Sequence, residues 1–225
     1  MATVKNAQLT REDWIAIARK ALIASGVDDV KVDVLARRLK VTRGSFYWHF
    51  ESRQDLLDAL LDDWEANNRR EIATIRQLMV SETDGTLVEL FRIWLSEDPS
   101  FPAFDFAIRA WARKAPKAAK LVREIDDSWI NLFQANLERG GMTSPESFVR
   151  ARIMYFHQVG YFALGLDEAL ADRAALAPYY YSALTGSPAP EGLADAMLAL
   201  AKNKADPGAA RARGAARKPV AKRTK

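Results

Sequence analysis

The sequence predicts an all-α protein, and three observations support this fold class. Apolar residues recur at intervals of three and four, which is the period of one helix face. No segment shows the sustained alternation of apolar and polar residues that marks a half-buried strand. Glycine and proline fall between the long amphipathic stretches. With 225 residues, of which 49% are hydrophobic, the chain has enough apolar side chains for a sizeable core.

The first helix begins after Thr10, which is a favourable N-cap. Asp13 stands three residues later, close to a capping-box arrangement. Gly26 suits the position just past the helix end, where a left-handed residue is needed. Two short helices are expected next, over 32–39 and 43–49, joined by a tight connection.

A long helix follows, with Ser52 as its cap, and its apolar stripe continues for about six turns. The stripe consists of Leu57, Leu61, Trp64, Asn68, Ile72, Ile75 and Met79. Further helices are expected near 85–97, 103–114, 117–139, 145–166, 168–185 and 190–204, because prolines and glycines separate these stretches.

Charge divides the chain into three parts. Residues 1–53 carry ten basic and six acidic residues, whereas 54–204 are acidic overall. Residues 205–225 carry seven basic residues and one acid, with no large apolar residue beyond Val220. Charge and composition therefore separate a basic part over 1–53, an acidic helical part over 54–204 and a basic tail over 205–225, and the tail is expected to be disordered. Two interpretations of the tail remain open, a polyanion-binding segment and a solvated charged surface.

The two short helices in the basic N-terminal part indicate a helix-turn-helix unit that binds DNA. The second helix must present short polar or cationic groups where it enters the major groove. The residues expected to contact bases are Thr42, Arg43, Gly44 and Ser45, and those expected to contact phosphates are Tyr47, His49 and Arg53. Arg43 is suited to bidentate hydrogen bonding with guanine. Phe46 and Phe50, four residues apart, are expected to anchor the inner face.

The run from Leu35 to Arg53, together with the Tyr47-Trp48-His49 triplet within it, resembles the tetracycline-repressor (TetR) family of transcriptional regulators. The resemblance covers residues 9 to about 61. It implies a homodimer, an N-terminal helix-turn-helix domain over 1–53 that binds an operator, and a C-terminal helical ligand-binding and dimerisation domain over 54–204. It assigns the base and phosphate contacts to the same seven residues.

Two positions depart from the family pattern. Lys40 stands where the family usually has glycine, so a lysine is expected in a strained or altered turn conformation. Lys31 and Val32 stand where a threonine or serine usually caps the first helix of the pair. The operator contacts of that helix are therefore not predicted.

Aromatic residues are abundant between 54 and 204, and two explanations fit them. Each one alone is more often a core residue, whereas together they suggest an apolar ligand cavity. The candidate pocket residues are Trp64, Trp94, Phe106, Trp111, Trp129, Phe133, Tyr155 and His157. The candidate polar members are Arg109, Gln134, Arg152, His157 and Gln158. Alternatively, Arg109 and Arg152 pair with Asp105 or Asp126 as buried ties.

Residues 148–166 are apolar on nearly every side, which predicts a helix buried on two faces. One stripe contains Val149, Ile153, Phe156, Gly160 and Leu164, and the other Tyr155, Val159, Phe162 and Leu166. One stripe is expected to face the domain core and the other a partner subunit. The family resemblance places the homodimer interface on the helices near 145–166 and 168–185.

Several function classes are disfavoured by what the sequence lacks. It contains no cysteine and only two histidines, and it shows no catalytic or metal-binding motif, so no enzyme, metal or cofactor is expected. No apolar run is long enough to span a membrane, and no secretion signal is evident, which predicts a cytoplasmic protein. The family resemblance implies that it is a bacterial protein associated with the nucleoid. The leading hypothesis is a repressor released from a palindromic DNA operator by a small apolar or aromatic effector. The alternative is a sequence-nonspecific basic nucleic-acid-binding protein.

Overall fold

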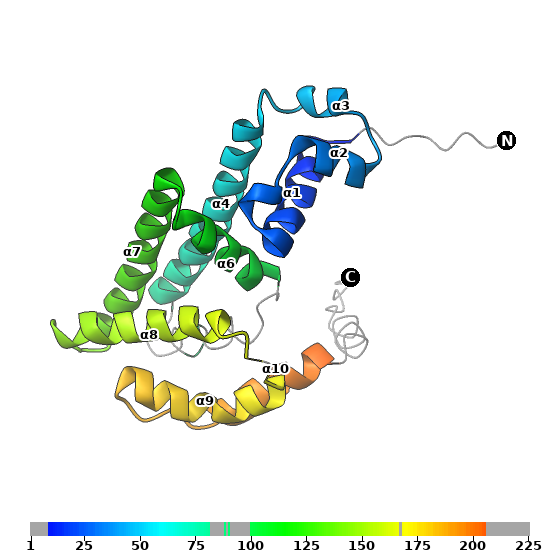
Figure 1. The fold of residues 1–225 in the computed structure, drawn as a ribbon. Helices are drawn as coiled ribbons and strands as arrows, with labels where there is room; N and C mark the ends of the chain where they lie inside the picture. The colour runs from blue at the N-terminus through cyan, green and yellow to red at the C-terminus, as the bar shows by residue number, and fades with distance from the viewer. Residues whose placement is uncertain (1–8, 82–87, 89, 91–99, 167, 206–225) are drawn as a thin grey trace, which may run out of the picture.

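The computed structural model describes residues 9–205 except 82–87, 89, 91–99 and 167. All of the regular elements in this part of the chain are helices, which confirms the predicted fold class (Figure 1). They are α1 (Arg11–Ser25), the short 3-10 helix η1 (Val27–Asp29), α2 (Val32–Leu39), α3 (Arg43–Tyr47), α4 (Arg53–Ser81), α6 (Ser100–Ala112), α7 (Pro116–Arg139), α8 (Glu146–Ala163), α9 (Leu170–Thr185) and α10 (Leu193–Ala205).

The helix limits follow the predicted ones closely. The helices from α6 to α10 begin and end within three residues of the expected positions, and α3 ends two residues early. Three predictions lie outside the described residues, namely the helix near 85–97 apart from Val88 and Leu90, the tail beyond Ala205, and Trp94.

Local signals determine the limits of α1. The backbone N–H of Asp13 donates to Thr10 Oγ1 at 3.3 Å, and the N–H of Thr10 donates to Asp13 Oδ2 at 2.8 Å. This reciprocal pair is the predicted capping box, with aspartate in place of glutamate. Gly26 ends the helix at φ 81° and ψ 177°, which is not the expected left-handed helical conformation but is equally dependent on glycine.

Helices α1, α2 and α3 pack around the ring of Phe46. This ring is fully buried, and its centroid lies 5.2 Å from that of Trp14 and 5.3 Å from that of Phe50. Leu35 and Ala36 of α2 are buried in the same core. The outer face of α3 is therefore left toward solvent, because its inner face is occupied by aromatic packing.

Both departures from the family pattern have structural counterparts. Lys40 ends α2 at φ 58° and ψ 40°, and it is the only residue other than glycine with a positive φ among the described residues. The strained lysine is thus confirmed. Lys31 occupies the N-cap of α2 and makes no side-chain capping hydrogen bond.

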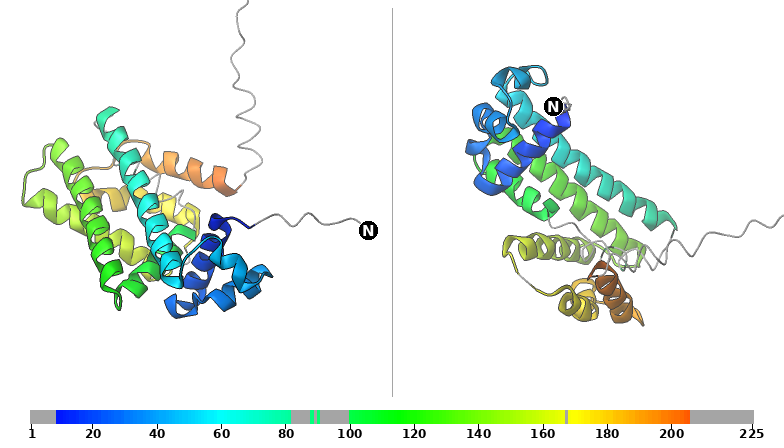
Figure 2. Two further views of the ribbon diagram at one scale, coloured as in Figure 1. Left: turned by 90° about the horizontal axis from the view of Figure 1, so that it is seen from above. Right: turned by 90° about the vertical axis from the view of Figure 1, so that its right-hand side faces the viewer.

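Helix α4 connects the N-terminal unit to the rest of the molecule. Its 29 residues span about 43 Å, and every member of the predicted apolar stripe is buried. It packs against α1, α6 and α7. Figure 2 shows α4 and α7 side by side in the right-hand view.

Helices α8, α9 and α10 form the end of the molecule opposite α3 (Figure 1). Helix α8 packs on α7, and α9 packs on α10. Large apolar side chains remain exposed on α8 and α9, including Val149, Ile153, Phe156, Leu176 and Tyr179. Within the described part of the chain, no helix is both long and apolar enough to cross a membrane.

Candidate functional site

The four predicted base-contacting residues lie together at the start of α3. Thr42 occupies the N-cap without a capping hydrogen bond from its side chain. Thr42, Arg43 and Gly44 are exposed, and Ser45 is half-buried. The α3 start therefore presents hydroxyl, guanidinium and bare backbone groups on the outside of the helix-turn-helix unit.

Arg43 is held in position by two neighbours. Its Nε lies 3.0 Å from Asp33 Oδ1, on α2, and both side chains are more than half exposed. A hydrogen bond with Tyr47 and the charge of Asp33 raise the pKa of Arg43 above its ordinary value. Asp33 thus orients the cation expected to read a base.

The predicted phosphate contacts occupy different environments. Tyr47 is exposed and His49 is half-buried. Arg53 donates from Nε to the Val30 carbonyl at 2.6 Å and from Nη2 to the Val27 carbonyl at 2.7 Å. Arg53 therefore ties the start of α4 to the segment before α2, a structural role that the sequence pattern did not reveal.

Trp48 was given no role from the sequence, yet it is the most exposed large apolar side chain found in the structure. Its exposed fraction is 87%. It lies between Tyr47 and His49 in the chain, at the C-cap of α3. Its position within the aromatic triplet was the available signal, because an indole placed on a DNA-facing surface combines a flat apolar face with an N–H donor.

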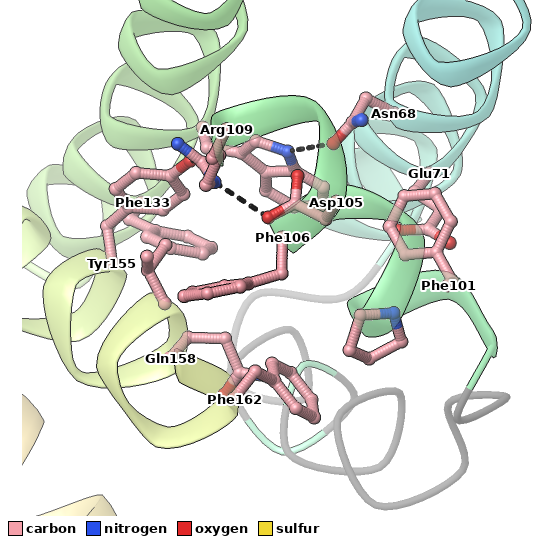
Figure 3. A pocket seen from close by; sticks show the side chains of 13 residues that line it. Asn68, Glu71, Phe101, Asp105, Phe106, Arg109, Phe133, Tyr155, Gln158 and Phe162 are labelled. Carbon is pink, nitrogen blue, oxygen red and sulfur yellow. Dashed lines mark hydrogen bonds and ion pairs between the residues drawn. The ribbon is translucent and has the colours of Figure 1, made fainter. Parts of the chain in front are cut away.

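A pocket opens between α4, α6, α7 and α8 (Figure 3). The space between its walls is about 640 Å³ when the open solvent at its mouth is counted, and the volume open to the centre of a water-sized sphere is about 70 Å³. Its lining residues are Asn68, Glu71, Phe101, Pro102, Asp105, Phe106, Arg109, Trp129, Phe133, Tyr155, Gln158, Val159 and Phe162. Of the predicted aromatic members, Phe106, Trp129, Phe133 and Tyr155 line it.

The remaining predicted members lie elsewhere. Trp64 is fully buried behind the pocket, where its Nε1 donates to Asp105 Oδ1 at 3.0 Å. Trp111 lines a separate hollow between α1 and α6. His157 packs against the ring of Tyr180 at a centroid distance of 5.0 Å, and burial together with Arg173 lowers its pKa. Lining residues that the sequence did not indicate include Glu71, Phe101 and Phe162.

One polar network connects three of the helices around the pocket. Arg109 Nε donates to Asp105 Oδ2 at 2.7 Å, and its two Nη atoms donate to Asp126 at 3.2 and 2.9 Å. Arg109 Nη2 also donates to Tyr155 Oη at 2.8 Å, and the Tyr155 hydroxyl donates to Asp126 at 2.6 Å. The prediction that Arg109 is a buried tie is confirmed, with both aspartates as partners.

The other predicted polar residues do not join this network. The Arg152 guanidinium lies over the rings of Phe148 and Phe156 at 5.4 and 5.2 Å, so the alternative of an aspartate pair does not apply to it. Gln134 donates to Glu138 on the outer surface of α7. Gln158 lines the pocket, and its Nε2 is buried without a hydrogen-bond partner.

The pKa shifts of Arg109 and Tyr155 indicate the protonation states in this network. Burial alone would lower the pKa of Arg109, but Asp105, Asp126 and Tyr155 together raise it above its ordinary value. Burial raises the pKa of Tyr155, so this residue remains a neutral hydrogen-bond donor. The guanidinium is therefore a permanent charge held between two carboxylates. No group of acidic, histidine or cysteine side chains suited to a metal ion occurs among the described residues.

Comparisons with known proteins agree with the N-terminal geometry. Residues 15–60 match the family described as "Bacterial regulatory proteins, tetR family". The chain is 41% identical over 59 residues to the HTH-type transcriptional regulator SrpR of Pseudomonas putida, a match that covers 26% of this chain and 28% of that protein. The chain thus spans less than a third of that relative's length, and the likeness concerns the N-terminal region.

Solved structures resemble the chain over most of its length. The fatty acid degradation regulator FadR from Bacillus halodurans is 16% identical, with a TM-score of 0.59, over 79% of this chain and 95% of that one. FadR from Bacillus subtilis, solved in complex with stearoyl-CoA, is 13% identical, with a TM-score of 0.51, over 84% and 96% of the two chains. At these identities the likeness concerns the fold.

Proposed function

We propose that the chain is a ligand-responsive transcriptional repressor that binds DNA through its N-terminal region, since residues 15–60 match the family of bacterial regulatory proteins of the tetR type. The observation that carries this proposal is the connection between two surfaces. The exposed start of α3 suits the major groove, and α4 runs from beside it to an aromatic pocket. Effector binding in that pocket would release the operator. A protein that binds chromosomal DNA works in the cytoplasm, at the nucleoid.

The DNA surface is expected to combine base reading with phosphate contacts. Arg43 reads a guanine, while Tyr47, His49 and the unused N–H groups of Arg53 contact phosphates. Arg43→Ala should weaken binding to an operator selected from random DNA by about 1–3 kcal/mol. It should also relax the base preference at one base pair in each half-site. The matched control is Arg38→Ala, an exposed arginine on α2. If Arg43→Ala lost the same binding free energy on the operator and on random DNA, Arg43 would contact only phosphate.

The exposed apolar faces of α8 and α9 support a homodimer with a two-fold axis. Val149, Ile153 and Phe156 are each about half exposed in the single chain, whereas Tyr155 on the other stripe is buried. Ile153→Glu should give monomers in sedimentation velocity and abolish symmetrical footprints of half-sites about 34–36 Å apart. Ile23→Glu, on α1, should leave the dimer intact.

The pocket has a direct mechanical path to the DNA-binding unit. Asp105 in the pocket wall is hydrogen bonded to Trp64 of α4. Phe106 lines both the pocket and the hollow in which α6 faces Leu22 and Ile23 of α1. A ligand that prefers one placement of α6 would therefore change operator affinity, typically by about 1–3 kcal/mol. A compound that saturates the pocket and leaves operator affinity unchanged would contradict this coupling.

The division into domains 1–53 and 54–204 fits this scheme, because α4 begins at Arg53. The tail over 205–225 would add a sequence-independent attraction for DNA. Deleting it should reduce the salt dependence of non-specific binding and leave operator preference intact. If DNA binding by the protein depended on the tail alone, this result would favour the alternative of a nonspecific basic nucleic-acid-binding protein.

A further inference from the structure

Glu71 is an acidic residue in an unusual place. It lies on α4 and faces the pocket beside Phe101 (Figure 3). Among the described residues, no side chain donates a hydrogen bond to its carboxyl group or forms an ion pair with it. Burial raises the pKa of Glu71, with Asp105 adding to the effect and Arg70 opposing it. Among the described residues, a charged Glu71 therefore has no hydrogen-bonded or ion-paired cation, and only the charge of the neighbouring Arg70 favours its ionised form.

The cation of the pocket does not supply this counter-charge. Among the described lining residues, Arg109 is the only basic one, beside the acids Glu71 and Asp105. Four of its five N–H groups are used by Asp105, Asp126 and Tyr155. The described lining therefore has an excess of negative charge, and none of its cations is available to bind an anionic ligand.

The remaining walls favour an apolar molecule that carries positive charge. Aromatic rings from α6, α7 and α8 surround the space, namely Phe101, Phe106, Trp129, Phe133, Tyr155 and Phe162. The negative face of an aromatic ring attracts a cation, most strongly where water is excluded. Gln158 adds an unpartnered amide donor for one acceptor group on the ligand.

We propose that this pocket binds a lipophilic aromatic cation, with Glu71 as the residue that pairs with its positive charge. The inference rests on the proposed function, since it specifies the effector class of the same pocket. A bound cation would provide the counter-charge that Glu71 lacks, and the rings would cover its apolar groups. A neutral aromatic ligand would leave Glu71 unpaired, and an anion would add a second repelling charge.

Two probes with the same shape and opposite charge test the proposal. Tetraphenylphosphonium and tetraphenylborate carry four phenyl rings around a positive and a negative centre, and triphenylphosphine oxide is the neutral reference. Isothermal titration of the full-length protein should show one site per chain for the phosphonium, at least about tenfold tighter than for either other probe. The basic tail attracts the borate, so it works against the expected order.

The matched variants are Glu71→Gln and Asp62→Asn. Both remove one carboxylate from α4, but Asp62 is exposed and does not line the pocket. Glu71→Gln should weaken phosphonium binding about tenfold and leave the neutral probe unchanged, whereas Asp62→Asn should change neither. Equal affinity for the three probes, tighter binding of the borate, or an unchanged phosphonium affinity in Glu71→Gln would overturn the ligand class.

Operator release separates this inference from the proposed function. If phosphonium binds in a Glu71-dependent manner but leaves the operator bound, the ligand class stands and the regulatory coupling fails. If a neutral aromatic compound releases the operator while the charge series shows no preference for the cation, the regulatory function stands and the ligand class fails.

Discussion

Arg109→Leu is expected to destabilise the fold more than any exposed arginine substitution. Arg109 lies on α6, and its side chain links this helix to α7 through Asp126 and to α8 through Tyr155. The leucine variant loses four hydrogen bonds and leaves two carboxylates without a counter-charge. Removing one partner of a buried ion pair costs about 3–5 kcal/mol. Here the three charged side chains keep 18 to 27% of their exposure, so the lower end, about 3 kcal/mol, is expected.

This loss can be measured as a change in unfolding temperature. For a chain of this length, each 1 kcal/mol shifts Tm by about 2–4 °C, so Tm should fall by about 6–12 °C. Far-ultraviolet circular dichroism would follow thermal and urea unfolding at one fixed protein concentration, because dimerisation makes Tm concentration-dependent. The control is Arg69→Leu, whose exposed pair with Glu65 should be worth less than about 1 kcal/mol.

A second variant tests the cause of the loss. Replacing Asp105 and Asp126 by asparagine in the Arg109→Leu background removes the two uncompensated charges, and should recover part of the lost stability. A loss for Arg109→Leu no greater than that of the control would refute the reasoning. So would a triple variant less stable than Arg109→Leu alone, because charge would then not be the origin of the effect.

Three further predictions concern single residues. Lys40→Gly should raise stability by about 1 kcal/mol in thermal unfolding, because glycine relieves the positive φ, whereas Lys40→Ala should give no gain. Glu71→Gln should stabilise the protein at pH 7. Since burial raises the pKa of Glu71, the advantage should fade as pH falls through that pKa, and an advantage that grew in acid would contradict the assignment. Trp48→Ala should weaken DNA binding in fluorescence anisotropy without lowering Tm, because the indole is 87% exposed; a fall in Tm would indicate a packing role instead.

The sequence by itself determined the features that depend on neighbours along the chain. The Thr10 and Asp13 capping box, the strained Lys40 and the buried stripe of α4 all depend on spacing within one turn or along one helix face. For the same reason the helix limits and the exposed start of α3 could be predicted. A residue's place on the inner face of a helix follows from the period of 3.6 residues.

Only the tertiary structure decided what each inward-facing side chain meets. Trp64 and Trp129 are both on inner faces, yet Trp129 lines the pocket and Trp64 does not. Asp105 of α6 lines the pocket in its place and accepts a hydrogen bond from the Trp64 Nε1. Arg53 meets two backbone carbonyls more than twenty residues away. Glu71 faces the aromatic cavity with no charged partner among the described residues. Contacts of this kind depend on how helices distant in sequence are arranged, and periodicity contains no information about that arrangement.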